Sequence, residues 1–171
     1  MEIDKRSWSV PHYLDACVAV KIFINEEGTQ GIQEYIRESS SFHFHLTEFA
    51  FYEVLSVLKR KWSNREIPKA KYFQAVFVLQ KYIEAEEITI DNDFQMTDAK
   101  VIVDLRDIVE KYNIDYSDAL QIYAVINGKW KHSVQDCKTI LVSADKKLVK
   151  ASRNMGLRTW HFPKEPSPAL N

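Results

Sequence analysis

The chain lacks three features that assign many proteins to a class at once: paired cysteines, a long apolar run and a strong charge bias. Its two cysteines, Cys17 and Cys137, have neither CxxC spacing nor a matching set of histidines, which argues against a zinc site and a disulfide framework. No apolar run approaches the ~20 residues that span a bilayer, and the N-terminus MEIDKRSWSV has no charged-then-apolar signal architecture. We therefore expect a soluble, cytoplasmic protein with no membrane partner.

The charge balance gives no bulk electrostatic attraction for nucleic acid. The formal net charge is −1 and the isoelectric point is about 6.5, so any binding of nucleic acid must be local. Basic residues do form clusters, each of which is either an ordinary solvated face or part of a rim around an acidic pocket. The clusters are Lys59, Arg60, Lys61 and Arg65; Lys129 and Lys131; and Lys146, Lys147, Lys150 and Arg153.

The length and composition fit one domain. With 171 residues and 46% hydrophobic composition, the chain can bury a full core in a single α/β domain, which we place at residues 1–163. No internal repeat, low-complexity tract or linker divides it. The proline-rich residues 164–171 are expected to form a mobile tail.

The apolar patterns alternate between strand and helix. We expect strands at residues 9–14, 41–46, 88–90, 139–142 and 157–162, and helices at 16–24, 30–39, 47–61, 68–82, 98–111, 117–126 and 147–155. Thr47, Thr97 and Ser117 are candidate N-caps, and residues 129–138 are expected to form a loop. Such alternation predicts three layers, with a mostly parallel central sheet and helices on both faces. In such folds, ligands bind beyond the carboxyl ends of the strands.

Four acidic residues stand at element ends or on an apolar helix face. Asp15 lies in HYLDACVAV, Glu53 in LTEFAFYEVLSVLKR, Asp118 in YSDALQIYAVI and Asp145 in TILVSADKKLVKAS. Taken singly, each aspartate has a simpler role, because Asp15 and Asp145 can cap the helices that follow and Asp118 can complement a helix dipole. Glu53 has no such role among Phe49, Ala50 and Val57.

The four acids together indicate one shared cation. Carboxylates are costly to desolvate unless a cation compensates, and Mg²⁺ or Mn²⁺ takes oxygen ligands. Such an ion can turn a bound water into a nucleophile and neutralise charge on a phosphate, which is the chemistry of a phosphodiesterase.

The motifs resemble the PIN-domain nucleases, most closely the VapC-type toxin branch, from Tyr13 to Phe162. The similar segments are LDACV, TEFAFYEVLSVLKR, SDALQIYAV and LVSADKKLVKASRNMGLRTW, in that order. The resemblance implies that Asp15, Glu53, Asp118 and Asp145 are catalytic metal ligands. It further implies that Ser143 supplies a supporting hydroxyl, while Asp115 is an extra ligand or a turn residue.

One position departs from the family. Where its members commonly have Thr or Ser after the first Asp, this chain has Ala16 and Cys17. A supporting hydrogen bond to Asp15 is therefore in question, although every acid is retained.

The resemblance implies a metal-dependent endoribonuclease that acts as the toxin of a toxin–antitoxin pair, with an RNA substrate and an antitoxin that occludes the acidic pocket. A housekeeping RNA-processing nuclease and a non-catalytic RNA-binding or protein-binding module are the alternatives. A receiver-type phosphoacceptor domain would also use an acidic Mg²⁺ pocket, but Asp15 has no adjacent acid and no isolated lysine ends a closing strand.

The remaining aromatic and histidine residues are assigned mainly to packing. His43 and His45 have no third ligand at zinc spacing, and Trp62, Trp130 and Trp160 can stack on bases or fill a core. The helix from Pro68 to Ile83 carries more apolar surface than one side of a helix needs, which predicts a homodimer.

Overall fold

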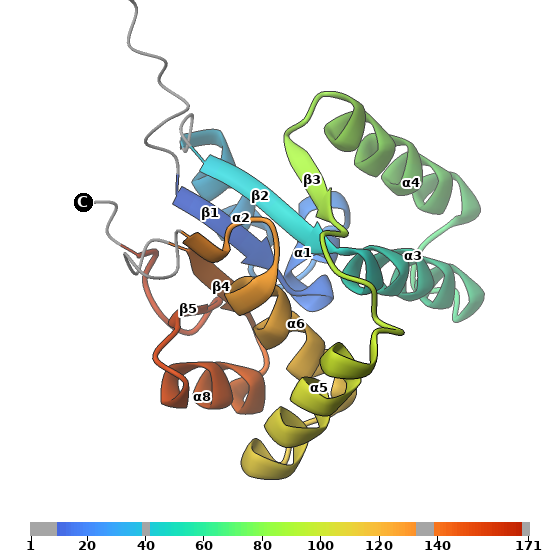
Figure 1. Cartoon of the computed structure of the whole chain (residues 1–171). Helices are drawn as coiled ribbons and strands as arrows, with labels where there is room; N and C mark the ends of the chain where they lie inside the picture. Colours follow the sequence, from blue (N-terminus) through green and yellow to red (C-terminus); the bar gives the residue numbers. More distant parts are fainter. Residues whose placement is uncertain (1–9, 39–41, 133–138, 169–171) are drawn as a thin grey trace, which may run out of the picture.

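The sheet at the centre of the fold is entirely parallel. The structure is a computed structural model that describes residues 10–38, 42–132 and 139–168. Five strands pair in the order β3-β2-β1-β4-β5 (Figure 1). Their bounds are β1 Val10–Leu14, β2 Phe42–Thr47, β3 Ile88–Asp91, β4 Ile140–Ser143 and β5 Arg158–His161. The predicted α/β class with a parallel sheet is therefore confirmed.

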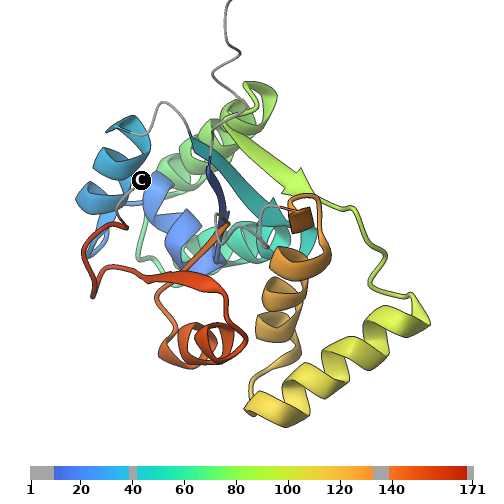
Figure 2. The same cartoon turned by 60° about the vertical axis from the view of Figure 1, so that its left-hand side comes forward.

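Helices cover both faces of this sheet, so the three-layer prediction is also confirmed (Figures 1 and 2). One face packs against α1 Ala16–Phe23, α2 Thr29–Glu38, α3 Glu48–Ser63 and α4 Lys69–Glu84. The other packs against α5 Ala99–Tyr112, α6 Tyr116–Asn127 and α8 Lys146–Asn154. No helix within the described ranges is both long and apolar enough to cross a membrane.

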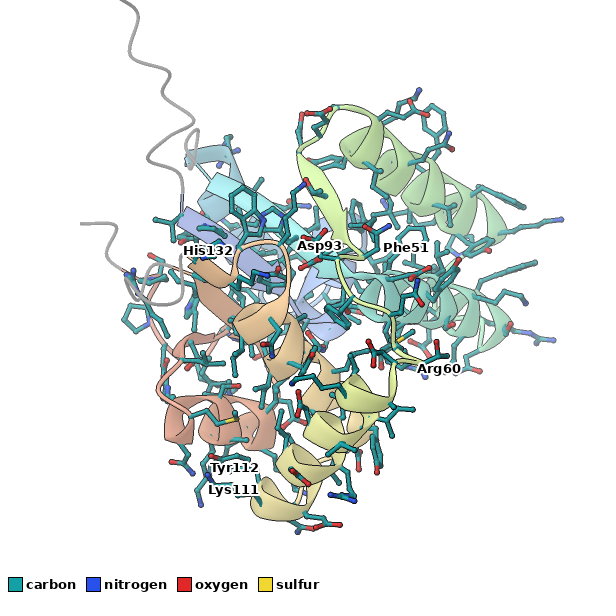
Figure 3. All side chains as sticks on the ribbon, in the orientation of Figure 1. Phe51, Arg60, Asp93, Lys111, Tyr112 and His132 are labelled. Atoms are coloured by element: carbon teal, nitrogen blue, oxygen red, sulfur yellow. The ribbon has the colours of Figure 1, made fainter. Side chains whose placement is uncertain are left out.

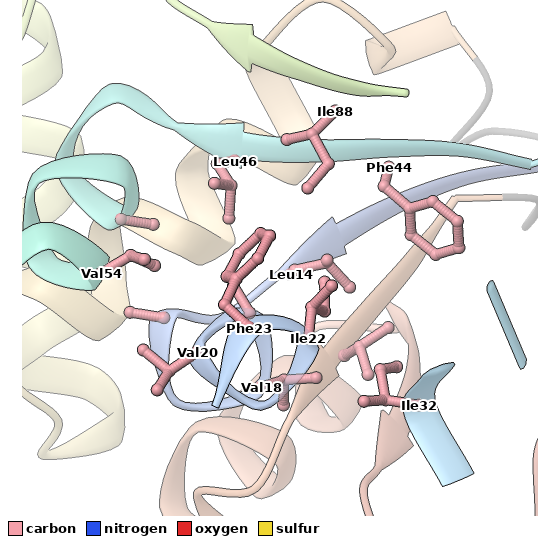
Figure 4. Close-up of a cluster of buried hydrophobic side chains, with 14 of the residues drawn as sticks. Leu14, Val18, Val20, Ile22, Phe23, Ile32, Phe44, Leu46, Val54 and Ile88 are labelled. Atoms are coloured by element: carbon pink, nitrogen blue, oxygen red, sulfur yellow. The ribbon is translucent and has the colours of Figure 1, made fainter. Parts of the chain in front are cut away.

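The alternation of side chains along the strands explains why there are two cores. Leu14 and Val142 belong to the core under α1 to α4, whereas their neighbours Tyr13 and Leu141 belong to the core under α5, α6 and α8. Figure 4 shows the first core, where Leu14, Phe44 and Leu46 of the sheet face the side chains of α1. Strands with both faces buried are usually apolar, and Ile140, Leu141 and Val142 of β4 fit this pattern.

The helix starts differ in detail from the predicted caps. Thr47 caps α3 as predicted, because its Oγ1 accepts a hydrogen bond from the amide of Ala50 at 3.0 Å. The prediction for Thr97 is wrong, since Asp98 accepts the amide of Lys100 and caps α5. The prediction for Ser117 is also wrong, because α6 begins one residue earlier, at Tyr116. Asp, Ser and Thr are similarly favoured at N-cap positions, so the sequence alone does not decide which of two neighbouring candidates caps the helix.

Several smaller predictions can be compared with the structure. His45 is fully buried and its ring packs between Tyr13 and Trp130, so it has a packing role as expected. The side chain of His43 lies outside the described residues, as does most of the predicted loop 129–138. In the predicted tail, Glu165 accepts a hydrogen bond from Arg153 at 2.6 Å, which attaches this part of the segment to the domain.

A buried aspartate fixes the end of α6. Asp91, at the end of β3, is 1% exposed and accepts a hydrogen bond from the hydroxyl of Tyr13 and one from the amide of Lys129 at 3.0 Å. The chain passes so close to this carboxylate that a Cβ atom at Gly128 would overlap with Asp91 Oδ2 and with the carbonyl oxygen of Ala124. Glycine is therefore required at this position by space rather than by backbone conformation.

We predict that Gly128→Ala destabilises the protein by roughly 1–3 kcal/mol, because the added methyl group displaces the Asp91 carboxylate or the end of α6. The matched control is Gly31→Ala inside α2, where a Cβ would meet Phe162 at an ordinary 3.7 Å. That control should be neutral or stabilising by up to about 1 kcal/mol. Urea unfolding of both variants makes the measurement, and equal stabilities would contradict the close packing at Gly128.

Candidate active site

A cleft of about 670 Å³ lies at the carboxyl edge of the sheet and contains all four predicted acids. Asp15 directly follows β1, and Asp145 lies two residues after β4. Glu53 comes from α3, and Asp118 comes from the first turn of α6. β1 and β4 are paired, so the first two acids are neighbours by topology, whereas helix packing brings in the other two.

Asp15 is the most firmly held of the four. It is 8% exposed, and its Oδ1 accepts a hydrogen bond from Gln121 Nε2 at 2.8 Å. Its Oδ2 accepts one from Ser143 Oγ at 2.6 Å and one from Cys17 Sγ at 2.9 Å. Asp15 occupies the N-cap position of α1 but makes no side-chain cap hydrogen bond, so helix capping does not explain this residue. Its bonds instead connect β1, β4 and α6.

Asp145 combines two roles. Its Oδ1 accepts hydrogen bonds from the amides of Lys147 at 2.6 Å and Leu148 at 3.1 Å, so it caps α8. The residue also lines the cleft. Capping leaves the other carboxylate oxygen, Oδ2, without a hydrogen bond from the described residues.

Asp118 and Glu53 are the acids whose protonation the cleft alters. The pKa of Asp118 is raised to about 7 by desolvation and by the carboxylates of Asp145, Asp15, Asp115 and Glu53, in that order. The pKa of Glu53 is raised by desolvation and by Asp15, and Arg60 acts in the opposite direction. Neither carboxylate accepts a hydrogen bond from another described residue. No hydrogen bond within the described part of the chain therefore offsets the charge of either group, and Arg60 offsets only part of it at Glu53.

The two supporting residues that the resemblance implies also lie here. Ser143 Oγ donates to Asp15 and accepts the amide of Asp145 at 2.9 Å, so one hydroxyl connects two of the acids. Asp115 occupies the N-cap position of α6 without a side-chain cap hydrogen bond and lines the cleft. Asp115, Asp118 and Asp145 also border an adjoining hollow of about 360 Å³ that Lys146 and Lys147 line.

The structure adds residues that the sequence analysis did not select. Gln121 is 2% exposed and orients Asp15; the detectable signal was an amide on an otherwise apolar helix, three residues after Asp118. Cys17 lies one residue after the position where the family commonly has Thr or Ser, and its thiol donates a hydrogen bond to Asp15. Ala16 cannot donate a side-chain hydrogen bond to Asp15, and Ser143, Cys17 and Gln121 donate three in its place.

Basic side chains also line the cleft. Lys21, Arg60 and Lys61 line it together with Glu26 and Glu66. Lys61 pairs with Glu26 and, at 3.1 Å, with Glu66, and Lys21 pairs with Glu26 at 3.3 Å. Two members of the basic cluster noted in the sequence, Arg60 and Lys61, therefore line the acidic pocket, whereas Lys59 does not.

The chemistry of the site fits a divalent cation. Four carboxylates with hard oxygen donors line one cleft, and two of them have raised pKa values that a cation would lower. In the conformation described, no three His, Cys, Asp or Glu side chains among residues 10–38, 42–132 and 139–168 are grouped as a ready metal site. Shared binding of one ion would therefore require some of these side chains to change conformation.

The fold and the acidic cleft define an α/β protein of nuclease type, and comparison with known proteins identifies the family. The profile of the PIN domain matches residues 12–154, so the chain belongs to the PIN domain family. PIN domains are generally nucleases and generally use divalent metals.

A solved structure with the same architecture is the crystal structure of PAE2754 from Pyrobaculum aerophilum. It is 14% identical, with a TM-score of 0.56, over 88% of this chain and 89% of that chain. At this identity the likeness shows the fold alone. No curated protein sequence matches the chain.

Without divalent cations, we predict that Asp118→Asn is more stable than the wild type at about pH 8, by on the order of 1 kcal/mol after allowance for solvent screening. The pKa of Asp118 is raised from 3.8 to about 7 in the folded protein. The folded state thus binds this proton more tightly than the unfolded chain does, and its contribution to stability falls as pH rises from about 4 to about 7.

Thermal unfolding in EDTA at about pH 5 and pH 8 measures this difference. Asp93→Asn, which removes a charge outside the cleft, is the control and should show no comparable pH-dependent gain. A constant difference between Asp118→Asn and wild type at both pH values would refute the raised pKa.

Proposed function

We propose that the protein is a metal-dependent endoribonuclease that hydrolyses phosphodiester bonds in RNA. The observation that carries this proposal is the convergence of Asp15, Glu53, Asp118 and Asp145 on one cleft of a PIN domain. Desolvation and mutual repulsion at Asp118 support it, since both are costs that a structural role alone does not explain.

The four carboxylates would hold Mg²⁺ or Mn²⁺, and Gln121 and Ser143 would keep Asp15 oriented toward the ion. A bound divalent cation supplies an activated water and neutralises charge that develops on the phosphate. The protein contributes the fixed orientation of Asp15 and the backbone attachment of Asp145 at the start of α8. Glu53 and Asp118, which have no such attachments, adapt to the ion.

The basic groups at the border support a polyanionic substrate. The whole chain is nearly neutral, so attraction of RNA depends on where the cations lie. Arg60 and Lys61 line the cleft, and Lys146 and Lys147 line the adjoining hollow, which shares Asp115, Asp118 and Asp145 with it. An extended strand could follow this border past the acids.

We predict that the purified protein cleaves single-stranded RNA with Mg²⁺ or Mn²⁺ and loses this activity in EDTA. Asp118→Asn and Glu53→Gln should each reduce kcat/KM at least about 100-fold, since each removes an oxygen ligand of the ion. Cleavage of a labelled oligonucleotide is the assay, with circular dichroism to verify folding.

Glu110→Gln is the control for loss of a carboxylate elsewhere, because Glu110 lies on the exposed face of α5. It should retain wild-type activity. Cleavage that persists in EDTA or in both cleft variants would point to a contaminating nuclease and contradict the assignment.

The toxin role rests on partners, and the exposed apolar surface supports a partner. Phe73 and Phe77, one turn apart on α4, are 55% and 58% exposed, whereas Leu79 of the same helix is buried. We propose that this face mediates a homodimer and that an antitoxin occludes the acidic cleft with a basic side chain. A product of the adjacent reading frame that binds and lowers nuclease activity favours the toxin role over RNA processing.

For the dimer, the double change Phe73→Ser and Phe77→Ser should convert a dimeric protein to a monomer, because it removes the exposed aromatic surface. Ile102→Ser on α5, which alters an apolar side chain 50% exposed elsewhere, is the control and should leave the dimer intact. Light scattering gives the mass. A monomeric wild type would contradict this part of the proposal.

A further inference from the structure

Arg60 differs from the other two cations that line the cleft. Lys21 and Lys61 share an ion pair with Glu26, and Lys61 also pairs with Glu66. The Arg60 side chain is exposed and, among the residues that the structure describes, has no salt bridge or hydrogen bond. Of these three cations, Arg60 is therefore the one whose charge is available to a ligand.

The position of Arg60 on α3 directs it to the site. Glu53, Val57 and Arg60 follow one another at spacings of four and three residues, and all three line the cleft. The guanidinium is close enough to act on the ionisation of Glu53. Figure 3 shows Arg60 on the edge of α3 that faces α5 in this view, away from α4.

The chemistry of the site requires such a group. Four carboxylates in one cleft repel a phosphodiester, even where a divalent ion offsets part of their charge. A guanidinium can donate two parallel hydrogen bonds to one phosphate, and it stays charged at every working pH. Lysine at this position would supply charge without the two-pronged geometry.

We propose that Arg60 is a substrate-positioning residue that binds a backbone phosphate of the RNA strand beside the bond that is cut. The inference rests on the proposed ribonuclease function and assigns the contact that holds the strand against the acidic cleft. The phosphate that Arg60 binds does not react, and the contact is equally strong in the ground state and the transition state, so its loss weakens binding more than it slows the chemical step.

The test is the affinity for a labelled single-stranded RNA in Mg²⁺, measured by fluorescence anisotropy in an Asp118→Asn parent that cannot cleave. Arg60→Ala in this parent should weaken binding about tenfold, and Arg60→Lys should recover part of the loss. When the logarithm of the association constant is plotted against the logarithm of salt concentration, the slope for Arg60→Ala should be shallower than that of the parent by about 0.7. This is the value for one phosphate contact of a single strand.

Lys59→Ala is the matched control, because it removes the same charge from the residue of α3 that directly precedes Arg60. Lys59 does not line the cleft; its Nζ lies 4.2 Å from the ring centre of Trp62 and bonds Ser63 at 2.9 Å. Lys59→Ala should change the affinity for RNA less than twofold and leave the salt dependence of binding unchanged. In the cleaving protein, Arg60→Ala should raise KM more than it lowers kcat.

The outcomes separate the two proposals. If the parent binds RNA, but Arg60→Ala and Lys59→Ala reduce the affinity equally, the role of Arg60 is overturned. The nuclease assignment is then unaffected. A wild type that neither binds nor cleaves RNA overturns the nuclease assignment, and the role of Arg60 falls with it. Melting temperatures of all variants show whether any loss of binding comes from unfolding.

Discussion

The carboxylate of Asp15 joins the segments from which the cleft is made. Its two oxygens accept hydrogen bonds from Ser143 and Gln121, which are 128 and 106 residues away in the sequence. These bonds connect the end of β1 to the end of β4 and to the inner face of α6. A buried carboxylate needs such donors, because an uncompensated charge inside the fold is costly. The bonds also fix the orientation of Asp15 in the cleft.

The remaining acids show a graded attachment that suits a cation site. Asp145 is held by backbone amides through Oδ1, whereas Asp118 and Glu53 lie in the same cleft without hydrogen bonds from described residues. The pKa values of both carboxyl groups are raised, first by burial and then by the charge of the neighbouring carboxylates. Stability is thus lower in this region without metal, and a bound cation would recover it. Such local conflict between stability and charge is characteristic of functional sites.

Much of the fold followed from local patterns in the sequence, because period and capping residues are local properties. The strand before Asp15, the apolar α6 and the cap at Thr47 were all predicted within a residue or two. The errors at Thr97 and Ser117 arose where two good capping residues stand close together, and only packing decides between them.

The four acids that line the cleft were selected from sequence, whereas most of the residues around them were not. Asp15, Glu53, Asp118 and Asp145 were selected because an acid among apolar neighbours is unusual in any local environment. Gln121 and Arg60 were harder to assign, since a glutamine or an arginine on a helix has many ordinary uses. Asp91 was missed because its partners, Tyr13 and the amide of Lys129, are distant in sequence. These contacts depend on the tertiary fold.

The claim that four carboxylates share one cation-binding cleft can be tested with a crystal soaked in Mn²⁺. Anomalous diffraction should show manganese among Asp15, Glu53, Asp118 and Asp145, with Glu53 and Asp118 turned toward the ion. The peak should disappear in Asp118→Asn crystals under the same conditions or lose most of its occupancy. Manganese bound elsewhere, or a fully occupied Mn²⁺ that touches fewer than two of these carboxylates, would contradict the claim.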